Sequence, residues 1–579
     1  MEVGPEPVDA RRAILPAAGA ALCVIVFWGV GLRYAGFRIP YGFGVQEIHP
    51  AELVFSVWYL FLGIPAIGLA ARALDAGRVP DRALSGLRKL GAQPWAVPAA
   101  VALAALTTLA IRAWVLQFAP TADDESTYVF IARTLLEGRL VNPSPGDEAF
   151  FRNQFIVLSD AAWYGKYPIG HPLVLAAGEA LGLRALVGPA LTAAALALTV
   201  AIGRRLWTPG QALLAGGLLL LSPQFLFTGA TELSQTTSGV CLLLAVWALL
   251  RLDEGGGLRA AAVAGAALGF GVLARPLPGL LFLAVAGLWV LIRYQDEPVV
   301  RQARRVAVGL APVALFGLVL LAVQAAQTGD PTRTSYDVYH GGSYRGFFRL
   351  EWISASLAGA LLRQNFWLFG WPISFLFLFF ARRDGRSALL WTLILAEYAY
   401  RVILPKTVVA STGPVYVAEV VPLLALLSAN GMAEATRRLA RHRVPRARER
   451  VAALALASVL VAATAFLPVQ LRDLHRSGST WQTAHRLLDE AGAERALVFA
   501  NAMVDVGSAA SWASYPPNPA PDLDDPRIFV RIPTGQGAAD RALDFWRRRF
   551  PDRSAWIFVW AEGQPLLKRL ESPVASSHP

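Results

Sequence analysis

Long apolar runs separated by short polar segments make up most of the chain. A bilayer core about 30 Å thick requires roughly 20 apolar residues per helix, and runs of this kind recur until about residue 470. We count about thirteen spans, of which the seventh and eighth are short enough to be two helices or the halves of one broken span. The predicted spans are 13–33, 51–71, 96–117, 184–203, 210–228, 235–251, 259–274, 277–293, 306–326, 366–381, 388–404, 415–434 and 451–468.

Composition agrees with a polytopic α-helical membrane protein. The 579 residues are 55% hydrophobic and 16% charged, and the mean hydropathy is +0.46. The first run follows Arg11 and Arg12 and is not followed by a small-residue cleavage site, so it is predicted to be a retained helix and not a signal peptide. Both cysteines, Cys23 and Cys241, fall within predicted spans, so no disulfide framework is expected.

Basic residues gather in alternate loops, which predicts the orientation of the chain. Cytoplasmic loops carry an excess of Lys and Arg, and here the basic loops follow the second, fourth, eighth, tenth and twelfth spans. The N-terminus is therefore predicted to be cytoplasmic, with loops 119–183 and 328–365 and the C-terminal tail on the periplasmic side of a bacterial inner membrane. Topology accounts for most of the net charge of +12, and we find no basic soluble face that predicts a nucleic-acid partner.

The pattern changes near residue 470 to short alternating runs, which predicts three parts of the chain. Residues 1–95 hold two extra spans and a cytoplasmic loop, 96–470 form the main membrane domain, and 471–579 form a small soluble α/β domain. Its predicted elements are helices 480–491 and 537–550 and strands 496–499, 527–532 and 556–560, with a proline-rich loop at 515–519. It has no phosphate-binding loop, metal-ligand spacing or nucleophile elbow, so a structural or acceptor-positioning role is predicted.

The first external loop contains the candidate chemistry. Asp123, Asp124 and Glu125 precede apolar positions at helical spacing, namely Tyr128, Ile131, Ala132, Leu135 and Leu136. Acidic residues in a first helical turn commonly cap the helix and oppose its dipole. The later segment 163–172 places Lys166 among aromatic residues and prolines. This lysine either reaches lipid headgroups or holds a phosphate.

These motifs resemble the GT-C superfamily of polyprenyl-phosphate-dependent glycosyltransferases. The resemblance rests on Asp-Glu-x-x-Tyr-x-x-x-Ala-Arg at 124–133 and Lys-Tyr-Pro at 166–168, and extends over residues 96–434. Similar motifs occur in lipid A aminoarabinose transferases, protein O-mannosyltransferases and relatives of rhizobial lipopolysaccharide transferases. Later segments that agree are 273–276, 328–331 and 413–416 with Glu419 and Pro422. Three departures bear on the donor and acceptor: Val415 stands where many relatives carry arginine, Lys-Tyr-Pro replaces Lys-Pro-Pro, and two extra spans come first.

The resemblance implies a GT-C fold and an inverting transfer of a sugar from polyprenyl phosphate to a lipid, glycan or protein acceptor. It implies Asp124 as the catalytic base, Glu125 as its support or as the group that orients the acceptor, and Lys166 as a contact to the lipid-linked phosphate. Arg275 is a second phosphate candidate, although a helix-end arginine also meets headgroups. Tyr128 and Tyr416 are candidates for stacking on sugar or for an interfacial aromatic belt. The predicted substrate-binding set is completed by Tyr167, His171 and Glu419.

The chemistry also follows from the residue types. Phosphate is a good leaving group, so one carboxylate base and one cation suffice for the transfer. A glycosidase usually needs two carboxylates that flank the bond, whereas Asp124 and Glu125 are adjacent and point in different directions on a helix. His171, His340 and Asp337 show no metal-ligand spacing, so neither a metal nor another cofactor is expected.

Two other functions are compatible with many membrane spans. A transporter or flippase for a lipid-linked sugar should show inverted repeats and charged groups near the bilayer midplane, and we find neither in the sequence. A non-catalytic scaffold that displays the C-terminal domain would leave the loop motifs without a role. Membrane lipids are expected contacts under all three interpretations.

Overall fold

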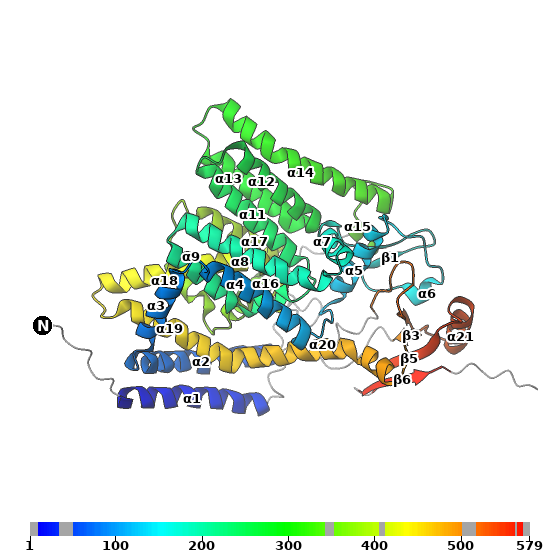
Figure 1. Ribbon diagram of the computed structural model, residues 1–579, viewed down its shortest axis with the longest axis horizontal. Helices are drawn as coiled ribbons and strands as arrows, with labels where there is room; N and C mark the ends of the chain where they lie inside the picture. Colours follow the sequence, from blue (N-terminus) through cyan, green and yellow to red (C-terminus); the bar gives the residue numbers. More distant parts are fainter. Residues whose placement is uncertain are drawn as a thin grey trace, which may run out of the picture.

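Helices dominate the computed structural model, which describes residues 10–33, 50–341, 353–403, 412–500, 517–561 and 564–570 (Figure 1). Within those ranges ten helices are long and apolar enough to cross a membrane, or eleven if one bent pair counts as a single span. The α-helices of the first half are α1 (Ala10–Arg33), α2 (Pro50–Ala76), α3 (Val79–Gly91), α4 (Ala96–Ala110), α5 (Asp123–Leu136), α6 (Glu148–Phe151), α7 (Gly170–Ala180), α8 (Val187–Leu206), α9 (Pro209–Leu220), α10 (Pro223–Gly229), α11 (Gln235–Asp253) and α12 (Gly257–Ala274).

The second half continues the bundle and then adds the C-terminal α/β region. Its α-helices are α13 (Pro276–Arg293), α14 (Val299–Thr328), α15 (Ser335–Tyr339), α16 (Ile353–Phe369), α17 (Ala388–Ile403), α18 (Val421–Arg441), α19 (Ala447–Val461), α20 (Leu467–Glu490) and α21 (Ala538–Arg549). Short 3₁₀ or π turns are η1 (Ile111–Val115), η2 (Arg184–Leu186), η5 (Ser374–Phe380), η6 (Val415–Val420) and η7 (Ala462–Phe466).

The count of thirteen spans predicted from the sequence is not reproduced, because some apolar runs are interrupted. The run at 210–228 is split into α9 and α10, which meet at a bend of 65°. Pro223 cannot continue the α9 hydrogen-bond ladder, and the Ser222 hydroxyl accepts a hydrogen bond from the Phe225 N–H to begin α10. The run at 366–381 is split at Gly370, which has a φ of +71°, and continues as the 3₁₀ turn η5. The run at 388–404 gives only a short apolar helix, Ala388–Tyr400.

Burial distinguishes the central helices of the bundle from the peripheral ones. The helical stretch Val415–Arg441 includes α18, and 89% of its most apolar 18 residues are buried. The corresponding share is 6% in α1 and in α14. The large hydrophobic side chains that α14 exposes are leucines and valines, as expected of a surface that faces lipid. Helix α18 therefore occupies the centre of the membrane part, while α1 and α14 lie at its edges (Figure 1).

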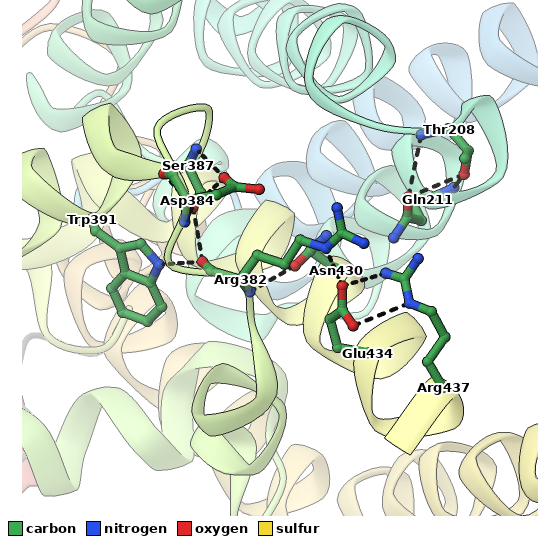
Figure 2. A network of polar contacts seen from close by, with 9 residues as sticks. All are labelled: Thr208, Gln211, Arg382, Asp384, Ser387, Trp391, Asn430, Glu434 and Arg437. Atoms are coloured by element: carbon green, nitrogen blue, oxygen red, sulfur yellow. Dashed lines mark hydrogen bonds and ion pairs between the residues drawn. The ribbon is translucent and has the colours of Figure 1, made fainter. Parts of the chain in front are cut away.

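Polar contacts fasten α18 to the segment that follows η5 (Figure 2). The Arg382 backbone N–H donates to Asn430 Oδ1 at 2.9 Å, and the Arg382 guanidinium pairs with Glu434. Glu434 also accepts from Arg437 Nη2 at 2.5 Å. The Trp391 indole N–H donates to the Arg382 carbonyl at 2.9 Å, which ties α17 to the same point. This network lies at the end of the bundle that carries α3, opposite the end that carries α5.

The C-terminal region contains a four-stranded sheet in the order β4-β3-β5-β6. Its strands are β3 (Ala496–Ala500), β4 (Arg527–Arg531), β5 (Ser554–Ala561) and β6 (Gln564–Arg569). Strand β3 is parallel to both β4 and β5, and β6 is antiparallel to β5. The predicted strands match β3, β4 and β5, whereas β6 was not predicted. The predicted boundary near residue 470 falls inside Ala447–Glu490, a continuous 44-residue helical stretch that runs from the bundle to the sheet.

One hydrophobic cluster joins this sheet to the 119–183 loop. Phe150 of α6 stacks on Phe545 of α21 with ring centroids 3.9 Å apart and planes at 10°. Phe130 of α5 and Trp163 of the short hairpin β1 (Ile156–Leu158) and β2 (Trp163–Gly165) belong to the same cluster. Strands β3 and β4 contribute Leu497, Phe499, Ile528 and Val530. The sheet and the loop therefore share one core.

We expect Phe545→Ala to destabilise this shared core. Truncating a fully buried aromatic side chain costs about 3–5 kcal/mol because a cavity remains, and Phe545 has no exposed surface. Thermal unfolding of the purified chain, followed by tryptophan fluorescence, should show a lower midpoint. The exposed Arg547→Ala on the same helix serves as control and should stay within about 0.5 kcal/mol of the unaltered chain. Equal midpoints for both variants would contradict a shared core.

Candidate active site

Helix α5 presents two different faces. Tyr128, Ile131 and Ala132 pack in a cluster with residues of α7, α12 and α14, and Leu135 lies against the same cluster. The amphipathic helix predicted from the sequence is confirmed, except that Leu136 is exposed. Asp124 precedes Tyr128 by four residues and Ile131 by seven, so it begins the face that packs against the membrane part.

Asp124 forms a hydrogen bond with Tyr167, the residue that follows Lys166. The Tyr167 hydroxyl donates to Asp124 Oδ1 at 2.6 Å. Burial, together with the nearby Asp124 charge, raises the pKa of Tyr167 well above its usual value. The phenol therefore stays protonated and remains a donor, which leaves Asp124 the acceptor. A strong neutral donor fixes the carboxylate without removing its charge.

Lys166 lies inside a box of aromatic rings. Its Nζ lies 3.8 Å from the ring centroid of Phe155 and 4.6 Å from that of Tyr339. The rings of Tyr167 and Tyr336 each lie 5.1 Å away. Tyr336 and Tyr339 belong to α15, which follows α14, so two loops distant in sequence meet at this lysine (Figure 1). Cation–π contacts orient the ammonium group and keep it in a largely apolar surround.

Glu125 connects the residues just before α5 to the segment that precedes α11. Its Oε1 accepts from the Thr121 N–H at 2.6 Å and from the Thr121 hydroxyl at 2.7 Å. Its Oε2 accepts from the Glu232 N–H at 2.7 Å. Burial raises the pKa of Glu125 from 4.5 to about 7, although these hydrogen bonds oppose the rise. The contacts of Glu125 are to protein groups that fix the start of α5.

His171 is also enclosed by protein groups. Its Nε2 lies 2.7 Å from the Glu232 carbonyl, so this nitrogen carries the proton, and Nδ1 accepts from the Thr237 hydroxyl at 2.9 Å. Burial lowers the pKa of His171 to about 4, which keeps the ring neutral. Its ring meets Tyr128 edge to face at 5.0 Å. His171 thus orders the packing beneath Tyr128. The preceding Gly170 allows a close approach, because a Cβ there would lie 2.4 Å from the Ala274 nitrogen.

Arg275 and Glu419 form a buried pair at the same end of the bundle. Arg275 separates α12 from α13, and its Nε lies 3.1 Å from Glu419 Oε1. Burial raises the pKa of Tyr128, and the positive charge of Arg275 partly opposes this rise. The guanidinium group therefore interacts electrostatically with a side chain of α5. Tyr416, in η6 with Glu419, is half-buried and packs against the cluster that contains Tyr128. The structure thus brings the predicted residues from four segments to one end of the bundle.

Several site residues were not predicted from the sequence. Glu232 pairs with Arg112 at 2.6 Å and with Arg184 at 3.0 Å, and its backbone binds Glu125 and His171. Asp123 is buried, and neither of its carboxylate oxygens has a hydrogen-bond partner among the described residues. Burial raises the pKa of Asp123 well above the usual value, and the nearby Asp124 charge adds a smaller rise. Glu232 and Arg112 lie within or beside apolar runs, where charged residues are costly unless paired. Their position in the sequence was therefore the signal that could have identified them as site residues.

The described part of the chain contains no group of three or more His, Cys, Asp or Glu residues placed to hold a metal ion. Four basic side chains lie at this end of the bundle. They are Lys166 in its aromatic box, Arg275 beside Glu419, and the Arg112 and Arg184 guanidinium groups on Glu232.

Comparison with solved structures finds glycosyltransferases. An ArnT from Cupriavidus metallidurans bound to undecaprenyl phosphate has a TM-score of 0.49 at 15% identity and covers 81% of this chain and 94% of its own. The archaeal oligosaccharyltransferase AglB from Archaeoglobus fulgidus, in complex with an inhibitory peptide and a dolichol-phosphate, has a TM-score of 0.39 at 13% identity and covers 69% and 62%. No family model and no curated protein matches the chain.

We expect Glu125→Gln to reduce stability and to change its pH dependence. An amide can replace only one of the two accepting oxygens, so a buried donor is left unpaired at a cost of about 1–3 kcal/mol. A pKa raised to about 7 means that the folded chain binds this proton more tightly than the unfolded chain. The contribution of Glu125 is therefore fully present below pH 4.5 and is lost as the pH rises towards 7.

Unfolding midpoints of the purified chain between pH 5 and pH 8 provide the measurement. The fall in midpoint with rising pH should be shallower in Glu125→Gln than in the unaltered chain. Exposed Glu490→Gln on α20 is the matched control and should leave the pH profile unchanged. The assignment fails if Glu125→Gln and Glu490→Gln give the same profile.

Proposed function

We propose that this chain is a membrane glycosyltransferase that moves a sugar from a polyprenyl-phosphate donor to a lipid, glycan or protein acceptor. The observation that carries this proposal is the Tyr167 side chain, whose hydroxyl binds Asp124 and whose ring lies beside Lys166. One carboxylate and one cation are thereby held beside one tyrosine side chain. This is the minimum set that displacement at a phosphate-activated sugar requires.

The proposed step is a single displacement. Asp124 removes the proton from an acceptor hydroxyl or amine, whose electron pair forms a bond to the anomeric carbon. The bond from that carbon to the phosphate oxygen breaks, and the polyprenyl phosphate leaves with the electron pair. Lys166 neutralises the charge that grows on the phosphate. One displacement inverts the anomeric configuration, so the product linkage has the opposite anomeric form to the donor.

The remaining predicted residues have supporting roles in this proposal. Glu125 and His171 fix the segments around Asp124 and Tyr128. Tyr128 and Tyr416 line the region where sugar binds, and Arg275, held by Glu419, directs a positive charge towards it. Charged groups at one end of the bundle fit a transferase working at the membrane boundary better than a flippase, which needs them along a path.

The proposed location is the bacterial inner membrane with α5 on the periplasmic side. The distribution of basic residues supports this orientation, because the cluster at the end of α18 lies at the α3 end of the bundle. The N-terminus would then be cytoplasmic and the C-terminal sheet periplasmic.

We expect Asp124→Asn to abolish most of the transfer while leaving carrier binding intact. Membranes containing the chain are supplied with radiolabelled polyprenyl-phosphate sugars, and label is followed into lipid, glycan and protein fractions. Loss of general-base catalysis should lower the rate about 10²- to 10⁴-fold. Asp160→Asn removes an exposed carboxylate from the same loop and should leave the rate unchanged.

Lys166→Ala should instead weaken both transfer and binding of undecaprenyl monophosphate, by about tenfold or more, because a buried cation to phosphate is lost. The exposed Lys89→Ala controls for removal of a lysine at the other end of the bundle. If Asp124→Asn and Lys166→Ala both transfer label like the unaltered chain, the loop assignment is wrong and translocation of the carrier becomes the better interpretation.

We further expect transfer to persist in EDTA. Lys166 supplies the positive charge at the leaving phosphate in the proposed step, so no divalent cation is required for that role. Rates with and without 5 mM chelator, about a thousandfold above trace metal, provide the test. Loss of transfer in EDTA that Mg²⁺ or Mn²⁺ restores would contradict this assignment of the phosphate charge.

A further inference from the structure

The second face of α5 is covered by the C-terminal region. Ser126, Phe130 and Arg133 follow one another at spacings of four and three residues, which places them along one side of the helix. Each of the three contacts or shares a cluster with residues beyond position 490. The side that begins with Asp124 faces the membrane part instead. Helix α5 is thus held between two bodies.

Asn518 contacts the first turn of α5. Its backbone N–H donates to the Ser126 hydroxyl at 2.8 Å, and its side-chain amide lies 3.5 Å from the Thr127 hydroxyl. The Asn518 Oδ1 accepts from the Asn153 amide at 3.0 Å, which ties the same point to the 119–183 loop. Ser126 and Thr127 are two and three residues from Asp124, so these contacts act on the turn that carries the proposed base.

Asp525 contacts the last turns of α5 and also holds the Asn518 segment. Its Oδ1 accepts from Arg133 Nη1 at 3.0 Å, and its Oδ2 accepts from the Ala520 backbone N–H at 2.5 Å. Arg133 lies 3.5 Å from Glu179 of α7 as well. One carboxylate therefore connects the third turn of α5 to the segment that binds its first turn.

The middle of this face is fastened by apolar contact. Phe130 is almost fully buried and lies in the cluster shared with β3, β4 and α21. Its ring centroid lies 4.7 Å from that of Trp163 in β2, and β2 precedes Lys166 and Tyr167 directly. A shift of the C-terminal sheet would therefore move α5 and the Tyr167 segment together.

We infer that the C-terminal domain positions Asp124, with Asn518 and Asp525 as the positioning residues. The inference deepens the proposed function, on which it rests, by giving the domain a role in the same reaction. A displacement of a reacting group by about 1 Å can cost 10²-fold in rate. Contacts at both ends of a helix that lies outside the bilayer restrict such displacement. The domain acts through α5 and not through contact with the sugar.

The test uses the full-length chain in lipid nanodiscs and compares Asn518→Ala and Asp525→Asn with matched controls. Gln536→Ala removes an exposed amide side chain from the same domain. Asp552→Asn removes an exposed ion pair, to Arg495, that does not touch α5. Asp525→Glu retains the charge and should restore part of the effect. Three quantities are measured: the transfer rate from labelled polyprenyl-phosphate sugar, the Kd for undecaprenyl monophosphate, and hydrogen exchange of the backbone amides of 123–129.

We expect Asn518→Ala and Asp525→Asn to lower kcat about 5- to 50-fold and to raise the exchange rate at 123–129 about tenfold, with the Kd unchanged within twofold. The two control variants should match the unaltered chain in all three. Unchanged exchange at 123–129, or a rate loss that merely follows a smaller folded fraction, would overturn the inference.

The same experiment separates this inference from the proposed function. If the unaltered chain transfers no label, the proposed function fails, while faster exchange at 123–129 in both variants still supports positioning of α5 by the domain. If the unaltered chain transfers label and the variants do so equally well, the positioning role fails and the proposed function stands.

Discussion

The burial of both faces of α5 is the constraint on which the candidate site depends. A 14-residue helix has little stability alone, and its packing between the membrane helices and the C-terminal sheet supplies what is missing. Asp124 begins the face that meets the bundle, and the β1–β2 hairpin that lies against α5 delivers Lys166 and Tyr167. The distance between the carboxylate and the ammonium group is therefore set by packing on both sides.

Buried charge imposes a second constraint on the same region. An ionised group removed from water needs a partner or a set of hydrogen bonds. Glu232 meets this need by pairing with Arg112 and Arg184, and Glu125 does so by accepting three hydrogen bonds. Arg275 and Glu419 compensate each other. These contacts join η1, η2 and η6 to the start of α5, to the segment before α11 and to the residue between α12 and α13. The electrostatics of the site and the packing of the bundle are therefore not separable.

The features that depend on the local pattern of hydrophobic and polar residues were predicted from the sequence. The amphipathic face of α5 and strands β3, β4 and β5 follow from periodicity, and each was placed within a few residues of its observed limits. The count of thirteen spans is not confirmed among the described residues, because apolar content does not register how Pro223 or Gly370 interrupts a helix. The aromatic box also escaped prediction, since Tyr336 and Tyr339 lie about 170 residues from Lys166. No local pattern links them.

The same limit applies to the C-terminal domain. Its elements were predicted, but its contacts with α5 through Asn518 and Asp525 join residues nearly 400 positions apart. Asn518 and Asp525 lie in a polar loop, and nothing in the sequence around them indicates that they contact α5. Such contacts emerge only when the fold brings the two segments together.

The fate of the carrier lipid tests the central claim most directly. Purified chain in proteoliposomes is given a polyprenyl-phosphate sugar labelled in the lipid, with membrane extract as the source of acceptor, and the lipid products are separated. A transferase that uses Asp124 releases one undecaprenyl phosphate for each sugar transferred, and Asp124→Asn releases almost none. Donor that crosses the bilayer intact, with no release of undecaprenyl phosphate, would contradict the account.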